Sequence, residues 1–279
     1  PRLPHDQIIL GTQPVSQSAV QRVVSHLERI RALAKTDQRA QVVSRSDFPA
    51  GAGIASSASG FAALTLAAVE AAGLQVSREA LSCMARLGSG SAARSIYGGF
   101  SEWHAGCTHE SSRAEQIAAP GHWPELRDIV AVLTQAPKQV SSTRGMALAR
   151  TSPHLETRLA LVPDRLARAR QAILDRNLRA LGEISEEEAI ELHFITMSSD
   201  PPLFYWCPAT ISLIHRVLAW RASGLNAYFT IDAGPNVHVL CQESDESAIV
   251  SALGRMPEVE RIIVNSPGPG ARLGPEHLF

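Results

Sequence analysis

The sequence predicts an α+β protein built as two lobes, with residues 1–124 forming the first lobe and residues 125–279 the second. The chain has 279 residues, of which 45% are apolar and 19% charged, so it can bury a core large enough for two lobes. Apolar residues at helical spacing dominate the first part of the chain. Near the end, two strands joined by a tight turn precede a helix and a last strand, an order typical of a ferredoxin-like lobe.

The elements of the first lobe follow from periodicity and capping residues. Apolar residues recur at helical spacing from Ser18 to Lys35, with Arg and Glu on the opposite face. Ser77 is placed to cap a helix that ends near Leu87. In chain order we expect a strand at 6–10, that first helix, a strand at Gln41–Ser44, a small-residue loop at Pro49–Gly60, an Ala-rich helix ending at Gly73, and the helix after Ser77.

The second lobe is predicted to begin with a β-branched strand and to continue with a long helical region. We expect breaks in that region near Ser152-Pro153 and at Pro163, because proline disrupts a helix interior. The expected elements are a strand at Ile129–Thr134, helices across Ser141–Leu192, a proline-stiffened turn at Ser198–Trp206, a helix at Ala209–Ala222, strands at Ala227–Asp232 and Val237–Cys241, a helix at Asp245–Leu253 and a strand at Val259–Val264.

Charge and cysteine content limit the function classes. Lys and Arg number 26 and Asp and Glu 27, so a formal charge of -1 gives no general attraction for nucleic acid or an anionic membrane. No apolar run approaches the roughly 20 residues that a membrane span needs. Four scattered cysteines without a CxxC pair are typical of a reduced, intracellular protein. We therefore expect a cytoplasmic protein, with neither nucleic acid nor membrane as partner.

The loop PAGAGIASSASG at Pro49–Gly60 is a candidate phosphate site. Its glycines permit close backbone approach to a ligand, and the helix that follows aims free N–H groups and its positive dipole end at the same place. The alternative is a small-residue loop needed only for close helix packing, since glycine-rich loops are weak motifs. The residues expected at the phosphates are Gly51, Gly53, Ser56, Ser57 and Ser59.

A second small-residue stretch, GSGSAARSIYGG at Gly88–Gly99, contains a cation. Arg94 lies in a predicted short helix with Ser91 and Ser95 beside it. The planar guanidinium suits a two-bond grip on a carboxylate or phosphate. The alternative is a surface arginine in an ion pair. The residues alone do not favour either interpretation of Arg94.

Asp232 in FTIDAGPN closes a predicted strand at a turn, where a rigidly held carboxylate can act as a general base or orient a substrate. The alternative is an aspartate that only caps the turn. In VSSTRGM, the hydroxyls of Ser141, Ser142 and Thr143 lie at a predicted helix start, where capping is the default role.

Several other polar residues are assigned structural roles. The ten histidines show no metal-ligand spacing, so no protein-held transition metal is expected. His193 is interpreted as a hydrogen-bonded core histidine, and the acidic run Glu186–Glu188 as a solvated helix face.

Together, the motifs resemble a known family. PAGAGIASSASGFAAL resembles the phosphate loop of the GHMP small-molecule kinase superfamily. ASSASGFAAL, GSGSAARSIYGGFSEW, VSSTRGM and YFTIDAGPN, in this order, resemble the mevalonate diphosphate decarboxylase family. The similarity runs from about residue 6 to Ser266–Gly270. It implies a two-lobed GHMP-kinase fold, with a ribosomal protein S5 domain 2-like N-terminal lobe and a ferredoxin-like C-terminal lobe.

The resemblance implies an ATP-dependent carboxy-lyase of the mevalonate isoprenoid pathway, with ATP and Mg²⁺ as cofactors and a homodimeric assembly. Asp232 matches the family aspartate at the substrate 3-hydroxyl, and Arg94 the arginine that holds the substrate carboxylate. Ser91 and Ser142 match positions near the substrate. Ser56, Ser57 and Ser59, with the amides of the same loop, match the ATP phosphate site.

Two departures from the family pattern leave alternatives open. The family has an N-terminal segment with a Tyr-Trp-Gly-Lys stretch that this sequence lacks, and because the first residue is Pro1 we expect a trimmed N-terminus. Ser198–Trp206 also differs from the eukaryotic-type stretch at this place. The alternatives to mevalonate 5-diphosphate decarboxylation are a phosphomevalonate decarboxylase that forms isopentenyl phosphate, a mevalonate 3-kinase without decarboxylation, and a non-catalytic relative.

Overall fold

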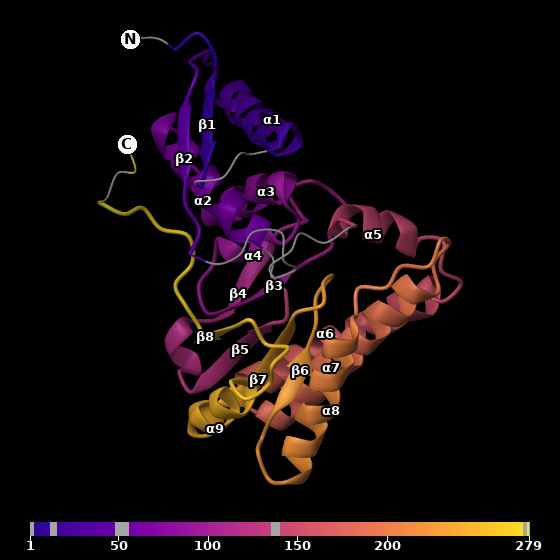
Figure 1. The fold of residues 1–279 in the computed structure, drawn as a ribbon. Coiled ribbons are helices and arrows are strands. Elements are labelled where there is room, and N and C mark those ends of the chain that lie inside the picture. The colour runs from indigo at the N-terminus through magenta and orange to yellow at the C-terminus, as the bar shows by residue number, and fades with distance from the viewer. Residues whose placement is uncertain (1–2, 12–15, 48–55, 135–139, 276–277, 279) are drawn as a thin grey trace. The chain divides into compact units, whose positions relative to one another are not determined.

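The computed structural model describes residues 3–11, 16–47, 56–134, 140–275 and 278. The chain divides into two compact units (Figure 1). Unit 1 comprises Pro1–Pro49, Ala55–Gln116 and Pro269–Phe279, and unit 2 comprises Ala50–Ile54 and Ile117–Gly268. The lobe boundary near residue 124 stays a prediction.

Unit 1 is built from short strands and packed helices. Its elements are β1 (Gln7–Leu10), α1 (Gln17–Ala34), β2 (Gln41–Ser44), α2 (Ser56–Ala71), α3 (Arg78–Gly88), α4 (Ala92–Ser95), β3 (Phe100–Trp103) and β4 (Ala114–Ala118), whose last two residues belong to unit 2. β1 and β2 pair in parallel and β3 pairs with β4. As predicted, Ser77 caps α3 by accepting a hydrogen bond from the amide of Ala80 at 3.2 Å.

The core of unit 1 lies between helices α1 to α4. Small residues let these helices approach closely, since Ala85 and the two alanines that open α4 are fully buried. The core side chains are Ile30, Phe61, Ala62, Val69, Leu81, Met84, Ala85, Ala92 and Ile96. Beside this core, Asp6 forms a buried ion pair with Arg31 and also accepts the amide of Ala40 at 2.8 Å, which ties β1 to α1 and to the start of β2.

Unit 2 is a four-stranded antiparallel sheet with helices. Its elements are the 3₁₀ turn Pro120–His122, β5 (Leu126–Val132), α5 (Ser142–Ala149), α6 (Leu155–Leu174), α7 (Leu178–Met197), α8 (Pro208–Ala222), β6 (Tyr228–Thr230), β7 (Val237–Gln242), α9 (Glu243–Leu253) and β8 (Arg261–Asn265). The strand order β6-β7-β5-β8, with helices after β5 and β7, is the ferredoxin-like pattern predicted from the sequence.

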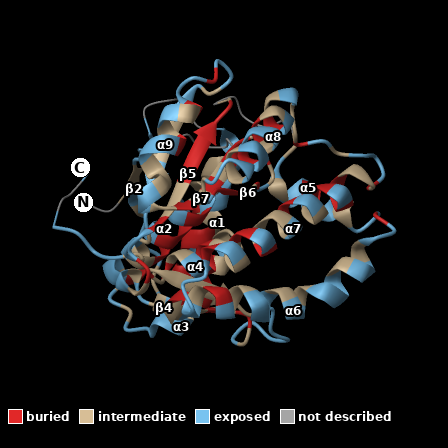
Figure 2. Cartoon of the chain, turned by 90° about the horizontal axis from the view of Figure 1, so that it is seen from below, coloured by how far each residue is buried: buried red, intermediate tan, exposed pale blue. Residues whose placement is uncertain are grey.

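In the strands of unit 2, successive side chains alternate between a buried face of the sheet and the opposite face. Val237, Val239 and Cys241 of β7 are fully buried in the core with α8 and α9. Figure 2 shows β5, which pairs with β7, largely in red as buried. His238 lies between Val237 and Val239 and therefore on the opposite face. In β6, Phe229 points to the core face and Thr230, which pairs with His238, to the opposite face.

Four details differ from the predictions. Strands β3 and β4 were not expected, and α2 begins at Ser56, inside the segment predicted as a loop. Pro163 lies within α6 without ending it, because it removes a single bond, to the carbonyl of the exposed Leu159. The helical region breaks instead at 175–177, where Arg176 adopts a positive φ of 53° and Asn177 caps α7.

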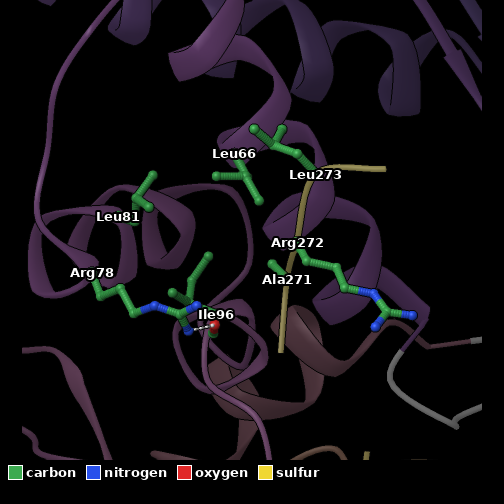
Figure 3. A pocket seen from close by; sticks show the side chains of 7 residues that line it. All are labelled: Leu66, Arg78, Leu81, Ile96, Ala271, Arg272 and Leu273. Atoms are coloured by element: carbon green, nitrogen blue, oxygen red, sulfur yellow. Dashed lines mark hydrogen bonds between the residues drawn. The ribbon is translucent and has the colours of Figure 1, made fainter. Parts of the chain in front are cut away.

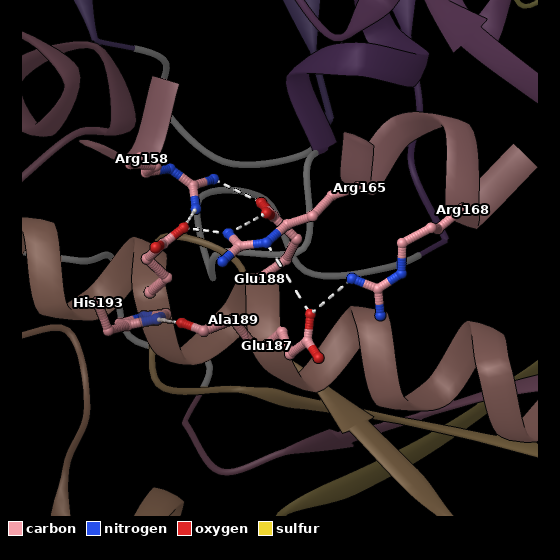
Figure 4. Close-up of polar contacts among 8 residues, drawn as sticks. Arg158, Arg165, Arg168, Glu187, Glu188, Ala189 and His193 are labelled. Carbon is pink, nitrogen blue, oxygen red and sulfur yellow. Dashed lines mark hydrogen bonds and ion pairs between the residues drawn. The ribbon is translucent and has the colours of Figure 1, made fainter. Parts of the chain in front are cut away.

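The fourth difference concerns Glu186 and Glu188, which were predicted as part of a solvated face but are only partly exposed and are paired with arginines, whereas Glu187 between them is exposed as predicted. Glu186 binds Arg221 at 2.8 Å and accepts the amide of Phe229 at 3.1 Å. Figure 4 shows the next two glutamates among the arginines of α6, with Glu188 bonded to Arg158 at 2.6 Å and Arg165 at 2.7 Å. The run was misjudged because its partners lie on α6 and α8, beyond the reach of local periodicity.

Among the described residues, no helix combines the length and the apolarity needed to cross a membrane.

Candidate functional site

The first candidate residues gather at the start of α2. Ser56 opens the helix, and Ser59 donates a hydrogen bond to the Ser56 carbonyl at 3.2 Å. Ser57 and Ser59 are exposed, so both hydroxyls are accessible to a ligand at the positive end of a 16-residue helix. Gly51 and Gly53, also predicted at the phosphates, lie outside the described residues.

The second small-residue stretch meets the first within unit 1. The hydroxyls of Ser57 and Ser89 lie 3.0 Å apart, so the start of α2 is joined to the segment that leads into α4. Gly88 and Gly90 are required for packing, since a Cβ at either would overlap the ring of Phe61 or Trp103. These two glycines thus allow close packing, and the hydroxyls of Ser57 and Ser89 are the polar groups available to a ligand.

Arg94 lies on the exposed side of α4, with Ser91 as the residue that precedes the helix. The two buried alanines of α4 fix the other side against the core, and Ser82 donates to the Ala93 carbonyl at 3.0 Å. The arginine therefore extends from a short helix whose backbone is anchored. This arrangement suits a guanidinium that must grip a planar anion in a fixed orientation.

In unit 2, Asp232 begins the turn Asp232–Asn236 just beyond β6 and is exposed. The turn is tightly held. The amide of Gly234 donates to the Asp232 carbonyl at 2.7 Å, and Thr210 of α8 donates to the Pro235 carbonyl at 2.7 Å. The carboxylate thus extends from a turn whose backbone is bonded to a helix.

Asn236 closes the same turn from the other side. Its buried side-chain oxygen accepts the amides of Leu133 at 2.8 Å and Thr134 at 3.2 Å, and its nitrogen donates to the Thr134 carbonyl at 3.3 Å. These bonds fasten the turn to the end of β5. Asn236 belongs to the quoted DAGPN motif, but nothing local in the sequence indicated its partners.

Ser142 is the first residue of α5, and Ser141 caps that helix by accepting the amide of Arg144 at 3.2 Å. The default capping role is therefore correct for Ser141. Ser142, one residue further, is partly exposed at the start of the helix. Within unit 2 the predicted site residues thus lie at two places: Ser142 at the start of α5, and Asp232 on the turn after β6.

The sequence did not reveal an Asp–His pair on the sheet of unit 2, formed by Asp128 of β5 and His238 of β7. The Nδ1 atom of His238 lies 3.0 Å from one oxygen of Asp128 and 3.1 Å from the other. Burial lowers the pKa of His238, but the charge and hydrogen bond of Asp128 and the charge of Asp232 outweigh it, so the net shift is upward. The signal that could have revealed the pair is the alternation of β7, which sets His238 apart from its apolar neighbours.

His193 is fully buried in α7, as the sequence predicted, and its Nδ1 bonds the Ala189 carbonyl at 2.7 Å. Burial lowers the pKa of this imidazole, while its hydrogen bond to the Ala189 carbonyl and the charge of Asp232 oppose the shift.

A pocket of about 270 Å³ lies elsewhere in unit 1 and contains none of the predicted site residues. Figure 3 shows Arg78 at its edge, bonded to the Ile96 carbonyl at 3.2 Å. The pocket lining is Leu66, Arg78, Leu81, Ile96, Ala271, Arg272 and Leu273. Across the described part of the chain, no three His, Cys, Asp or Glu side chains are arranged to hold a metal.

Two family profiles match the chain. Residues 1–114 match the diphosphomevalonate decarboxylase-like N-terminal domain, and residues 128–266 match the mevalonate 5-diphosphate decarboxylase C-terminal domain. The order of the two domains is the order of the motifs in the sequence.

Named relatives agree with the profiles. The chain is 34% identical to diphosphomevalonate decarboxylase mvd1 of Aspergillus fumigatus, over 89% of this chain and 66% of that protein. It is 34% identical to the diphosphomevalonate decarboxylase of Candida albicans, over 87% of this chain and 73% of that protein. The chain thus spans about two thirds to three quarters of the length of these relatives, and 54% of the Homo sapiens enzyme.

Solved structures have the same fold. Mevalonate diphosphate decarboxylase from Staphylococcus aureus matches with a TM-score of 0.90 at 35% identity, covering 96% of this chain and 82% of that one. MDDEF in complex with MVAPP, AMPPCP and magnesium matches with a TM-score of 0.89 at 36% identity, with the same coverage. The profiles, the relatives and the structures confirm the resemblance drawn from the motifs, and the chain belongs to the diphosphomevalonate decarboxylase family of the GHMP kinase superfamily.

Proposed function

We propose that the protein carrying this chain uses ATP to convert mevalonate 5-diphosphate into isopentenyl diphosphate, ADP, phosphate and carbon dioxide. Two observations support the proposal, each within one unit: in unit 2, Asp232 is exposed on a turn bonded to α8 and to the end of β5, and in unit 1, Arg94 is exposed on a helix with a buried, anchored backbone. Support also comes from the relative MDDEF, which was solved with MVAPP, AMPPCP and magnesium.

The first step is phosphorylation of the substrate 3-hydroxyl. Asp232 accepts the proton of that hydroxyl, or holds it in line, while the oxygen attacks the γ-phosphorus of ATP and ADP leaves. Phosphoryl transfer needs mainly positioning and charge neutralisation. Ser56, Ser57 and Ser59 would bind the ATP phosphates at the positive end of α2, with Ser142 and Ser91 beside the substrate.

The second step breaks two bonds. The 3-phosphate departs with the electron pair of its C–O bond, and the electrons of the bond to the carboxyl carbon form the new double bond as carbon dioxide leaves. Arg94 holds the carboxylate in the orientation that this elimination requires. The carboxylate charge disappears in the product, so the grip of Arg94 weakens after the reaction.

Magnesium suits this donor set as an ion that enters with ATP. Mg²⁺ is bound in such sites through phosphates and one or two carboxylates, and not by a dedicated protein cage. The serine hydroxyls at the start of α2 are oxygen donors at the place where the phosphates are expected. When bound, the ion would neutralise phosphate charge.

Two further properties are part of the proposal. The family resemblance supports a homodimer. The scattered, unpaired cysteines support a cytoplasmic location.

The substrate is tested by incubating the intact protein with ATP, magnesium and either mevalonate 5-diphosphate or mevalonate 5-phosphate. We expect carbon dioxide and ADP with the 5-diphosphate. Carbon dioxide from the 5-phosphate alone would assign the phosphomevalonate branch, for which the divergent Ser198–Trp206 segment is the supporting observation. ADP without carbon dioxide from either compound would indicate a 3-kinase, and neither product would indicate a non-catalytic relative.

A further inference from the structure

Arg22, an exposed residue of α1, contacts both α2 and the end of α3 in unit 1, where these three helices pack together. Its guanidinium donates a hydrogen bond to the carbonyl of Gly88, the last residue of α3, at 2.9 Å. The carbon of the same guanidinium lies over the ring of Phe61 in α2, 4.9 Å from the ring centroid, which is a cation–π distance. One side chain of α1 therefore holds the end of α3 and the first half of α2 together.

Phe61 and Gly88 also lie directly against each other. A Cβ at Gly88 would overlap the ring of Phe61, so the backbone at the end of α3 can approach α2 only because this residue is glycine. Arg22 bonds that backbone and covers that ring. The close approach of α3 to α2 is thus fixed by a side chain from a third helix.

Ser89, the next residue, extends this contact to the predicted phosphate site. Its hydroxyl lies 3.0 Å from that of Ser57, which is exposed in the first turn of α2. Since one hydroxyl donates to the other, the hydrogen of the accepting hydroxyl can be directed at a phosphate oxygen. On the other side of Ser89, Gly90 packs against the ring of Trp103, which a Cβ would overlap. The Ser89 backbone is therefore held on both sides, by Arg22 and by Trp103.

Arg29 offers a comparison on the same helix. It lies about two turns further along α1 and donates to the Leu87 carbonyl at 3.3 Å. Both arginines thus bond carbonyls at the end of α3, where the last carbonyls of a helix need partners. If these arginines only capped α3, they would matter equally. If the placing of Ser89 is what counts, Arg22 should matter more, because its bond is shorter and ends on the adjacent residue.

We propose that Arg22 is a positioning residue for the ATP phosphates, which holds the Gly88–Ser89 backbone against α2 so that the hydroxyls of Ser57 and Ser89 present one fixed pair to the ligand. The proposal rests on the ATP-binding role proposed above for the start of α2. It adds that this role depends on a side chain of α1, outside both small-residue stretches.

The test titrates the intact protein with the ATP analogue AMPPCP and magnesium, beside steady-state kinetics. Arg22→Met removes the guanidinium but keeps a long side chain that favours a helix, and Arg22→Lys keeps the positive charge. Arg29→Met is the matched control on the same helix. Ser89→Ala removes one hydroxyl, and the double variant Arg22→Met/Ser89→Ala tests whether the two residues act together.

We expect Arg22→Met to raise the Kd for AMPPCP and the KM for ATP by about tenfold, the size of effect that loss of one hydrogen bond to a charged group gives. The KM for mevalonate 5-diphosphate and kcat should stay within about twofold of the wild type, because only nucleotide binding is weakened. Arg22→Lys should recover part of the loss, and Arg29→Met should match the wild type. Ser89→Ala should also raise the Kd, and the double variant should bind no more weakly than the weaker single variant.

A wild-type Kd in Arg22→Met, or an equal increase in Arg29→Met, would overturn the inference. Additive losses in the double variant would also overturn it, because Arg22 would then act independently of Ser89. If Arg22→Met does not fold, Arg22→Lys and Ser89→Ala decide, and an unchanged Kd in both contradicts the proposal. If the wild type binds AMPPCP but releases no carbon dioxide, the proposed decarboxylation fails while the binding data still decide the role of Arg22. A wild type that does not bind AMPPCP would overturn both.

Discussion

Arg94 and Asp232 are held by different means. Arg94 extends from a four-residue helix anchored by buried alanines, and Asp232 from a turn bonded to both α8 and the end of β5. In both cases a rigid backbone presents one exposed charged side chain. Because the backbone is already ordered, the main entropy that each residue would lose on binding a substrate is that of its side-chain rotamers.

Replacing Arg94 by lysine tests whether activity needs the planar, two-pronged guanidinium or only its positive charge. Lysine keeps the positive charge but cannot bind a carboxylate through two parallel bonds. We therefore expect Arg94→Lys to lower kcat/KM by on the order of a hundredfold or more, in the range of a lost charge-stabilising contact. Steady-state kinetics measure it, and near wild-type activity would show that charge alone suffices.

His238 predicts a pH-dependent contribution to stability. Its pKa is raised in the folded protein, so its contribution is fully present below the unfolded pKa and is lost as pH rises through the folded pKa. We expect His238→Gln to shift the urea midpoint more at about pH 6 than at about pH 9. An equal shift at both pH values would contradict the charged Asp128–His238 pair.

At the same scale, loop composition and motif order predict Arg94, Asp232 and the serines as site residues, and these roles stay predictions. The contacts that hold residues in place were much harder to predict. Asp128 and His238 were missed because the pair joins residues 110 positions apart, across two strands whose register no local pattern reveals.

Among the elements, α7 joins most of the others in unit 2. Glu186 bonds Arg221 of α8 and the amide of Phe229 in the edge strand β6, and two glutamates further along bond the arginines of α6. Gly182 lets the ring of Tyr228 lie against the helix, because a Cβ would overlap it. The helix thus holds the strand that leads to Asp232.

Glu186 and its neighbour Glu187 form a matched pair of variants. Glu186→Ala would leave the amide of Phe229 without its acceptor and the partly buried Arg221 without its carboxylate, at a cost of about 1–3 kcal/mol in the free energy of unfolding. Glu187→Ala removes an exposed carboxylate that makes long ion pairs, at 3.9 Å to Arg165 and 3.4 Å to Arg168, and should cost less than about 1 kcal/mol. Urea unfolding compares them, and equal losses would contradict the role assigned to Glu186.

Elements with strong periodicity or a capping residue were predicted well: the ends of α1 and α3 agree to about one residue, and the four strands of unit 2 were found with ends displaced by up to about three residues. Strands β3 and β4 were missed because they are short and lie in segments rich in polar and small residues. The predicted break at Pro163 was wrong because the packing of α6 on α7 through paired charges outweighs one lost backbone bond.

At the scale of the whole molecule, each unit contains a buried histidine whose protonation in acid should destabilise the folded protein. Burial, aided by the charge of Arg29, lowers the pKa of His26 to about 4, and burial lowers that of His193. When folding lowers the pKa of a histidine, the folded state gains stability at pH values above the pKa of the unfolded state. This stability is lost as the pH falls from that value toward the pKa in the folded state. The protein should therefore lose stability between about pH 6.5 and pH 4.

The variant His26→Gln tests this expectation, because the glutamine amide extends about as far as the Nε2 that contacts Thr65 but does not titrate. Urea midpoints measured across that pH range should fall less steeply for the variant than for the wild type. Parallel curves would show that His26 does not contribute to acid sensitivity.

The central claim is that one site phosphorylates a 3-hydroxyl and then releases carbon dioxide. The most direct measurement is the ratio of carbon dioxide to ADP formed from mevalonate 5-diphosphate by the intact protein, with Asp232→Asn beside it. The account predicts one carbon dioxide per ADP in the wild type, and loss of both products by on the order of a hundredfold or more in the variant. ADP formed without carbon dioxide, or undiminished turnover in Asp232→Asn, would contradict it.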